Sequence, residues 1–208
     1  MAGELERLRE VMARLRAECP WDAEQTHASL LNHLIEEACE VVDAVETGDD
    51  VDLREELGDL LLQVYFHSQI AADEGRFDLD DVARGITDKL IRRHPHVFAG
   101  ADAPADVRVA WEQNKRTEKG RTSSLDGIAH SMSVVARAHK VISRSRQHQV
   151  PVALPQETIT SAQVGRQFIE LVARAQASRI DADAAMRAAL RELEADIAAA
   201  ETGAEPSQ

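Results

Sequence analysis

Two pairs of acidic residues are the part of this sequence that points most directly to chemistry. Glu37 and Glu40 form the first pair, Glu56 and Asp59 form the second, and the members of each pair are three residues apart. On a helix this spacing places both carboxylates on one face. Apolar residues surround each pair, and carboxylates held together in such surroundings need a compensating cation. Four oxygen donors suit Mg²⁺, with Mn²⁺ as the alternative, and Mg²⁺ commonly binds together with substrate phosphates.

The elements that must position the two pairs are predicted to be two helices joined by a tight turn. Apolar residues recur at helical spacing over residues 30–46 and again over about 51–73. Thr47-Gly48-Asp49-Asp50 between them is a strong stop and turn signal. Each acidic pair lies roughly two helical turns from it, so an antiparallel hairpin brings the pairs level and facing each other. The alternative is an ordinary solvated helix face, which the leucines around the second pair disfavour: Leu57, Leu60 and Leu61.

The rest of the chain is predicted to be helical as well. Apolar residues at helical spacing predict a first helix that ends before Pro20, which cannot continue it. Thr26 or Ser29 is expected to cap the next helix, and Asp78 is expected to cap a helix over about 79–92. No segment alternates apolar and polar residues over a useful length, so we expect no sheet of consequence. The predicted fold class is all-α, an antiparallel helical bundle.

Composition restricts the class of protein. The 208 residues are 44% hydrophobic but only 3% aromatic, so the core must be mainly aliphatic. The formal net charge of -13 argues against stable binding of nucleic acid or of an anionic membrane, which needs basic surfaces. No window approaches the roughly 18 apolar residues of a membrane span, and the first residues lack the apolar region of a signal peptide. We therefore expect a cytoplasmic protein, with Cys39 buried in its core.

Several motifs together resemble a known family. Glu36-Glu37-x-x-Glu40, fifteen further residues and then Glu56-x-x-Asp59 match the EExxE…ExxD signature of the all-α nucleoside triphosphate pyrophosphohydrolases. Three other segments narrow the resemblance, which runs in order over residues 5–150, to the MazG branch: Cys19-Pro20-Trp21-Asp22 followed by Glu24-Gln25-Thr26, then Arg93-His94-Pro95-His96-Val97-Phe98, then Trp111-Glu112-x-x-Lys115. The resemblance implies hydrolysis of the α–β phosphoanhydride of NTPs and dNTPs to monophosphate and pyrophosphate, a housecleaning of the nucleotide pool.

The resemblance also implies roles for individual residues. It implies that Glu37, Glu40, Glu56 and Asp59 hold Mg²⁺, whereas Glu36 either orients or deprotonates the attacking water or supports the ligands. These five are the expected catalytic residues. Contacts to the nucleotide are expected from two tryptophans, which either stack on a base or simply pack, and from cations and a histidine: Trp21, Trp111, Lys89, Arg92, Arg93, His94 and Lys115. For Lys89 and Arg92 the alternative is favourable placement at a helix C-terminus.

The C-terminal third departs from the family pattern. Tandem MazG proteins carry two copies of the domain, and here residues 163–171 and 180–187 resemble two segments of the first copy. Gln163 and Arg166 stand where Glu56 and Asp59 would be, so the metal ligands are lost. Coincidental similarity between amphipathic helices is the alternative. We infer four parts: a MazG-like domain 1–146, a linker 147–155, a degenerate helical half-repeat 156–200 and a disordered tail 201–208.

Three hypotheses about function stay open at this stage. The leading one is a Mg²⁺-dependent hydrolase of NTPs and dNTPs. The second keeps the chemistry and narrows the substrate to phosphoribosyl-ATP, dUTP or dCTP. The third is a non-catalytic helical interaction protein, which the intact first set of acids argues against. In each case the helices are apolar over so much of their surface that we expect a homodimer or a higher homo-oligomer.

Overall fold

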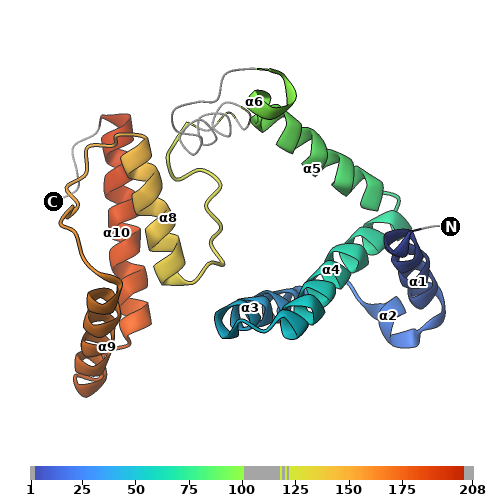
Figure 1. Cartoon of the computed structure of the whole chain (residues 1–208). Helices are drawn as coiled ribbons and strands as arrows, with labels where there is room; N and C mark the ends of the chain where they lie inside the picture. Colours follow the sequence, from blue (N-terminus) through green and yellow to red (C-terminus); the bar gives the residue numbers. More distant parts are fainter. Residues whose placement is uncertain (1–2, 101–117, 119, 121, 204–208) are drawn as a thin grey trace. The chain divides into compact units, whose positions relative to one another are not determined.

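The computed structural model describes residues 3–100, 118, 120 and 122–203, and every regular element within these ranges is a helix (Figure 1). The predicted all-α fold class is confirmed. The chain divides into two compact units, residues 1–102 and 103–208. None of the helices in the part of the chain that the structure describes is long and apolar enough to cross a membrane.

The first unit begins with a helix that ends at the predicted break. Helix α1 spans Glu4–Glu18, and Cys19 then adopts an extended conformation. Pro20 begins a short helix, α2 (Pro20–Glu24), that the sequence did not predict. Proline is tolerated at the first position of a helix because its missing N–H would have no partner there. The same residue therefore ends one helix and starts another.

The segment between α2 and the next helix corrects one prediction. Thr26 and Ser29 do not cap helix α3 (Leu31–Thr47), which is preceded by Leu30 without a side-chain cap. The two residues instead bond to each other: the Thr26 N–H donates to Ser29 Oγ at 2.9 Å, and the Ser29 N–H donates to Thr26 Oγ1 at 3.1 Å. Their side chains close a turn that precedes α3.

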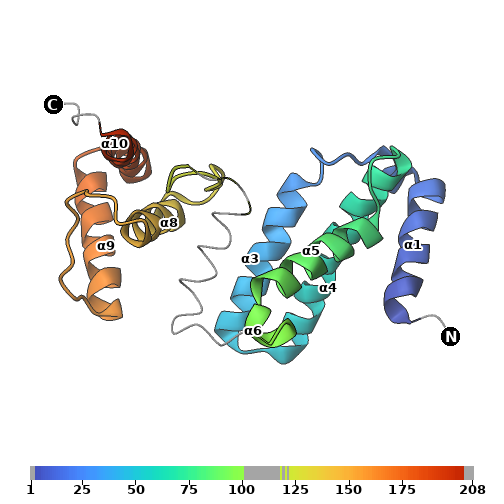
Figure 2. The same cartoon turned by 90° about the horizontal axis from the view of Figure 1, so that it is seen from above.

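The hairpin that was predicted to carry the acidic pairs is present. Gly48 ends α3 in a left-handed conformation with φ of 75°, which glycine adopts without steric cost. The Asp49 carboxylate then accepts hydrogen bonds from the backbone N–H groups of Val51 and Asp52, and helix α4 spans Asp50–Asp73. The two helices lie side by side and antiparallel (Figure 2).

Helix α1 packs on the other end of α4 and closes the core of the first unit. The buried members of this core come from α1, α4 and the residue before α3: Met12, Leu30, Tyr65, Phe66 and Ile70. The Tyr65 hydroxyl donates to the carbonyl of Leu5 at 3.1 Å, which satisfies a polar group inside the contact. The core therefore fixes the end of the hairpin that lies away from its turn.

Helix α5 (Leu79–Arg93) follows the predicted start signal. Asp78 and Asp81 form a reciprocal capping box at its N-terminus, so the predicted cap is confirmed. Arg9 of α1 forms an ion pair with Asp80, which ties the beginning of α5 to α1. A short helix, α6 (Pro95–Phe98), comes directly after α5.

One broad face of the α3–α4 hairpin is exposed within the chain. Leu31, Ile35, Val42 and Val45 lie along α3 at helical spacing and are 51–60% exposed. Cys39 of α3 is exposed as well, so its predicted burial in the core is wrong. The physical reason is that α1 covers α4 rather than α3, and no described residue of the first unit covers this side of α3.

The second unit contains three described helices, α8 (Val134–Gln147), α9 (Ser161–Ala177) and α10 (Ala182–Thr202). Its buried core joins α8 to α10 and to the segment before α8: Ile128, Val141, Leu190 and Ile197. Because this core includes Ile128 and Val141, the second unit takes in residues that the sequence analysis assigned to a domain over 1–146.

Local structure explains two further residues of the second unit. Gln163, which the sequence analysis aligned with Glu56, shares a capping box with Thr160 at the N-terminus of α9 and so has a local role. Helix α10 continues to Thr202, so the first two residues of the predicted disordered tail are helical. The segment 148–160 contains no helix, in keeping with its prolines.

Candidate metal centre

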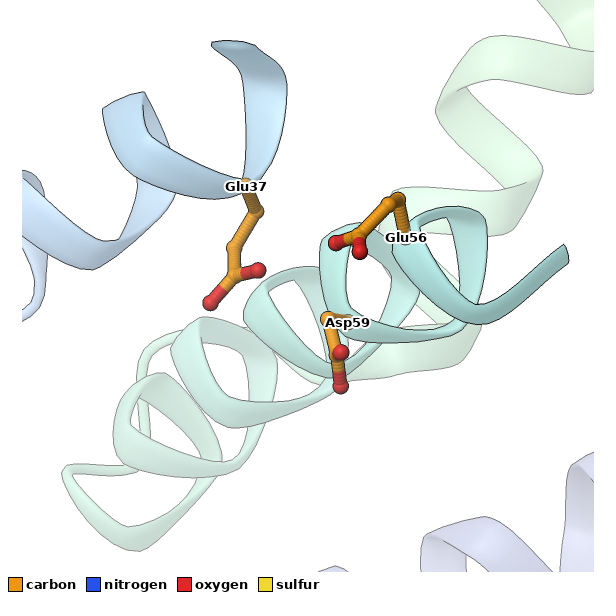
Figure 3. A group of neighbouring side chains, drawn as sticks. All are labelled: Glu37, Glu56 and Asp59. Carbon is orange, nitrogen blue, oxygen red and sulfur yellow. The ribbon is translucent and has the colours of Figure 1, made fainter. Parts of the chain in front are cut away.

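The hairpin brings three carboxylates from two helices together. Glu37 of α3 and Glu56 and Asp59 of α4 each offer an oxygen within 4.8 Å of the others, and all three side chains are partly buried. Figure 3 shows Glu37 on one helix and Glu56 and Asp59 on the other. No second group of three or more potential metal-ligating side chains occurs among the residues that the structure describes.

The electrostatics of this carboxylate group favour a bound cation. Burial raises the pKa of Glu37, and the charges of Asp59 and Glu40 raise it further. Burial also raises the pKa of Glu56, with the charges of Glu40 and Asp59 as the next causes. Like charges held close together in a partly desolvated site disfavour ionisation of each member. A cation removes that repulsion, so the charged forms become the stable ones when it binds.

Glu40 lies at the edge of this group rather than within it. Its side chain is exposed and is not among the three that converge within 4.8 Å. Its charge nevertheless raises the pKa of both Glu37 and Glu56. The four carboxylates therefore form one electrostatic unit, and their donors are all oxygens, which fits Mg²⁺ or Mn²⁺.

Glu36 faces another set of side chains. Its carboxylate lies 3.7 Å from Nδ1 of His33, one turn earlier on α3. The His33 ring lies edge-on to Trp21 of α2, with centroids 6.3 Å apart, and Trp21 lies edge-on to Phe66 at the same distance. Trp21 is 54% exposed, so a large part of its indole is accessible to a ligand. His33 and Phe66 are both farther from the hairpin turn than the carboxylates are. Trp21 therefore lies beyond the carboxylates, on the side away from the turn.

The predicted cations lie on a different helix. Lys89, Arg92 and Arg93 occupy the last two turns of α5, and Arg93 is buried while Lys89 is partly buried. Nδ1 of His94 lies 2.7 Å from the carbonyl of Leu90, and the His94 ring lies edge-on to His96. Trp111 and Lys115 lie outside the described residues.

Arg16 is a residue of the site region that sequence reasoning did not identify. Its Nη1 donates to the carbonyls of Asp22, Ala23 and Gln25, and its Nε donates to Asp73 at 3.0 Å. Its guanidinium also lies over the Phe66 ring, 5.9 Å from the centroid. Arg16 therefore holds the segment that carries Trp21. Contacts from an arginine to carbonyls six to nine residues later have no sequence signal that could have predicted them.

A pair of histidines is a second feature that sequence reasoning missed. Nδ1 of His27 lies 2.7 Å from Nδ1 of His67, and the two rings are parallel within 3°. Arg76 reaches Nε2 of His27. Arginine can only donate, so His27 Nε2 accepts, His27 Nδ1–H donates to His67, and His67 carries its own proton on Nε2. Both rings are neutral in this arrangement, and together they join the α2–α3 segment to α4.

Comparison with known proteins agrees with these observations. The model of the MazG nucleotide pyrophosphohydrolase domain matches residues 25–98, which include all four acids. The nucleoside triphosphate pyrophosphohydrolase of Escherichia coli K12 is 47% identical over 150 residues, covering 68% of this chain and 57% of that protein. The nucleoside triphosphate pyrophosphohydrolase of Mycobacterium tuberculosis is 44% identical over 157 residues, covering 74% of this chain and 48% of that protein.

A longer match extends into the second unit. A 26.1 kDa protein of Streptomyces cacaoi, described as uncharacterized, is 44% identical over 197 residues, covering 92% of this chain and 80% of that protein. In contrast, the chain spans about half the length of the two pyrophosphohydrolases above. The matched domain, the acids within it and the all-helical fold agree, and the chain therefore belongs to the MazG nucleotide pyrophosphohydrolase family.

Proposed function

We propose that this chain hydrolyses nucleoside triphosphates, both NTPs and dNTPs, at the α–β phosphoanhydride, and that Mg²⁺ is the required metal. The products are a nucleoside monophosphate and pyrophosphate. The observation that carries the proposal is the convergence of Glu37, Glu56 and Asp59 within the range matched by the MazG domain. The names of the related enzymes support the same reaction. Such a reaction would act on the nucleotide pool of the cytoplasm.

The proposal gives each of these residues a role. Glu37, Glu56 and Asp59 would hold the metal, with Glu40 as the fourth ligand. A bound Mg²⁺ supplies neutralisation of phosphate charge and a lowered pKa of its bound water. Glu36, beside the ligands on α3, would orient the attacking water or accept its proton. Phosphoryl transfer depends mainly on positioning and charge stabilisation, and these residue types can provide both.

The nucleotide contacts proposed outside the carboxylates come from two regions. Trp21 would stack on the base, which its exposed indole allows. Lys89, Arg92, Arg93 and His94 would meet phosphate oxygens that the metal leaves uncovered. Trp111 and Lys115 are proposed for the same tasks from the sequence motif alone.

The test is an assay of the pure protein with each of the four NTPs and four dNTPs in the presence of Mg²⁺. Products are separated by ion-exchange chromatography, and we expect monophosphate and pyrophosphate in equal amounts. Chelation of the metal should abolish turnover. Release of NDP and orthophosphate, or turnover that survives chelation, would contradict the proposal. Phosphoribosyl-ATP and dUTP are assayed alongside these eight, and activity confined to one of them or to dCTP would instead favour a selective enzyme of the same superfamily.

We propose in addition that the protein is a homodimer formed through the exposed face of the hairpin. The apolar residues of this face come from both helices: Leu31, Ile35, Val42 and Val45 of α3, and Leu57 and Val64 of α4. Contiguous apolar surface of this kind commonly marks a protein–protein contact. A two-fold contact would pair each hairpin with its copy and form a four-helix arrangement.

A further inference from the structure

Gln63 is a buried polar residue within an apolar stretch of α4. Its exposed fraction is 5%, and its neighbours in sequence include Leu61, Leu62 and Phe66. Its Oε1 has no hydrogen-bond partner among the residues that the structure describes. A buried acceptor without a partner is unfavourable, and such groups in native proteins commonly have a ligand or a mechanistic role. Packing alone therefore does not account for an amide at this position.

Gln63 lies on the face of α4 that carries the metal-ligating acids. It comes four residues after Asp59 and seven after Glu56, and both intervals return to the same side of a helix. His67, another four residues along, also has a buried atom on this face, Nε2, that lacks a partner among the described residues. The stripe of polar groups thus continues from the carboxylates along α4, away from the hairpin turn.

The register of the hairpin places Gln63 between two other parts of the site. Glu37 lies opposite Asp59, and because α3 and α4 are antiparallel, the residue one turn before Glu37 and the residue one turn after Asp59 lie in the same direction. These residues are His33 and Gln63. Trp21 contacts both the His33 ring and the Phe66 ring, three residues beyond Gln63. From Asp59 to Phe66 the helix rises roughly 10 Å.

We infer that Gln63 is a specificity-determining residue that hydrogen-bonds the nucleoside of the substrate. The inference rests on the proposed function. There the metal held by the carboxylates would bind the phosphates, and Trp21 would stack on the base. The part of a nucleotide that joins these two ends then passes Gln63. Its Oε1 is an acceptor, so the complementary group is a hydroxyl of the sugar or an N–H of the base.

The test compares two variants that remove the same amide from different faces of α4. Gln63→Met keeps the length of the side chain and removes its polar head. Gln69→Met is the matched control, because Gln69 bonds to Asp73 at 2.8 Å and lines a small cavity with Arg9 and Met12 of α1. For each protein, kcat/KM is measured with all eight nucleotides, together with the Mg²⁺ concentration that gives half-maximal activity and the melting temperature.

We expect Gln63→Met to lower kcat/KM for the best nucleotide by at least about tenfold, which corresponds to the loss of one hydrogen bond. The ratio of kcat/KM between the best and the worst nucleotide should become smaller. The Mg²⁺ concentration that gives half-maximal activity should stay that of the wild type. If kcat/KM no longer differs between ribose and deoxyribose forms of a nucleotide, the partner of Gln63 is a sugar hydroxyl. If kcat/KM no longer differs between bases, the partner is an N–H of the base. Gln69→Met should leave both ratios unchanged.

Two results would overturn the inference. One is an equal loss for every nucleotide with all ratios retained, which would show a structural role. The other is no loss at all. If Gln63→Met does not fold, Gln63→Asn keeps the amide but withdraws it, and the same ratios should change. If the wild-type protein hydrolyses no nucleotide, calorimetric binding of α,β-methylene nucleoside triphosphates to the two variants tests Gln63 separately from the proposed reaction.

Discussion

At the scale of single residues, the carboxylate group brings together like charges whose repulsion a bound cation would relieve. Glu37 and Glu56 have raised pKa values because burial and neighbouring acids disfavour their charged forms. The same acids that would bind the metal therefore destabilise the fold when no metal is present. Function and stability oppose each other at these positions, which is a common property of built sites.

Substitution of one ligand should separate the two effects. We expect Asp59→Asn or Glu40→Gln to lower kcat by at least ~10²-fold, because charge stabilisation in the transition state is lost. The melting temperature measured with a chelator should stay the same or rise, since one of the repelling charges is gone. Glu10→Gln, which removes an exposed acid from α1, is the control. Near-normal turnover in both ligand variants would show that these acids are not the site.

At the scale of elements, the sequence predicted those parts that local signals determine. The hairpin could be predicted because two neighbouring residues determine its turn. Gly48 ends the first helix in a left-handed conformation, and the Asp49 carboxylate caps the start of the second. The α2–α3 segment could not be predicted, because its shape depends on Arg16 and on the His27–His67 pair, which join residues far apart in sequence. Thr26 and Ser29 were predicted as caps of the following helix and instead bond to each other, three residues apart, in the turn before it.

The His27–His67 pair predicts a pH dependence of stability. Burial lowers the pKa of His67 below its ordinary value of 6.5, and the neighbouring His27 lowers it further. The unfolded chain then binds more protons than the folded one, so stability is lost as the pH falls through 6.5 towards the folded value. Protonated His67 would also turn an Nδ1–H towards the Nδ1–H of His27, while Arg76, itself paired with Glu74, adds a further positive charge.

The measurement is a series of urea unfolding curves from about pH 5 to about pH 8. This interval brackets the ordinary histidine pKa of about 6.5. We expect the free energy of unfolding to fall on the acid side in the wild type and to fall less in His67→Gln. His96→Gln removes another histidine of the same unit and serves as the control. Equal slopes in the wild type and His67→Gln would show that the pair does not control this titration.

At the scale of the whole molecule, the C-terminal segment 156–200 is predicted to have a structural rather than a catalytic role. In the predicted half-repeat Gln163 and Arg166 stand where Glu56 and Asp59 would be, and the structure gives Gln163 a place in a helix cap. Deletion of residues 156–208 removes Leu190 and Ile197, which would uncover Val141, a side chain with no exposed surface. We expect a lower melting temperature or a changed oligomeric state, with activity reduced only as a consequence. A truncated protein with unchanged mass, melting temperature and turnover would remove the case for this role.

The proposed homodimer depends on the exposed apolar face of the hairpin. Ile35 is 59% exposed and Val45 is 60% exposed, on the helix that also carries Glu37. Side chains of this kind are expected to find cover, because exposed apolar surface is unfavourable by roughly 25 cal/mol for each Å². A contact through this face would also brace α3 and so hold Glu37 opposite Asp59. Assembly and metal binding are therefore expected to depend on the same helix.

The last prediction tests that dependence. Light scattering at micromolar concentration should give at least twice the 22.9 kDa mass of one chain. The double variant Ile35→Glu, Val42→Glu should shift the mass towards that of one chain, because charges at the centre of the contact would be buried without partners. Its Mg²⁺ requirement should rise as α3 loses support. Glu18→Gln, at an exposed site on α1, is the control. A wild-type mass near that of one chain would contradict the dimer, and a monomeric variant with full activity would show that the metal site does not need it.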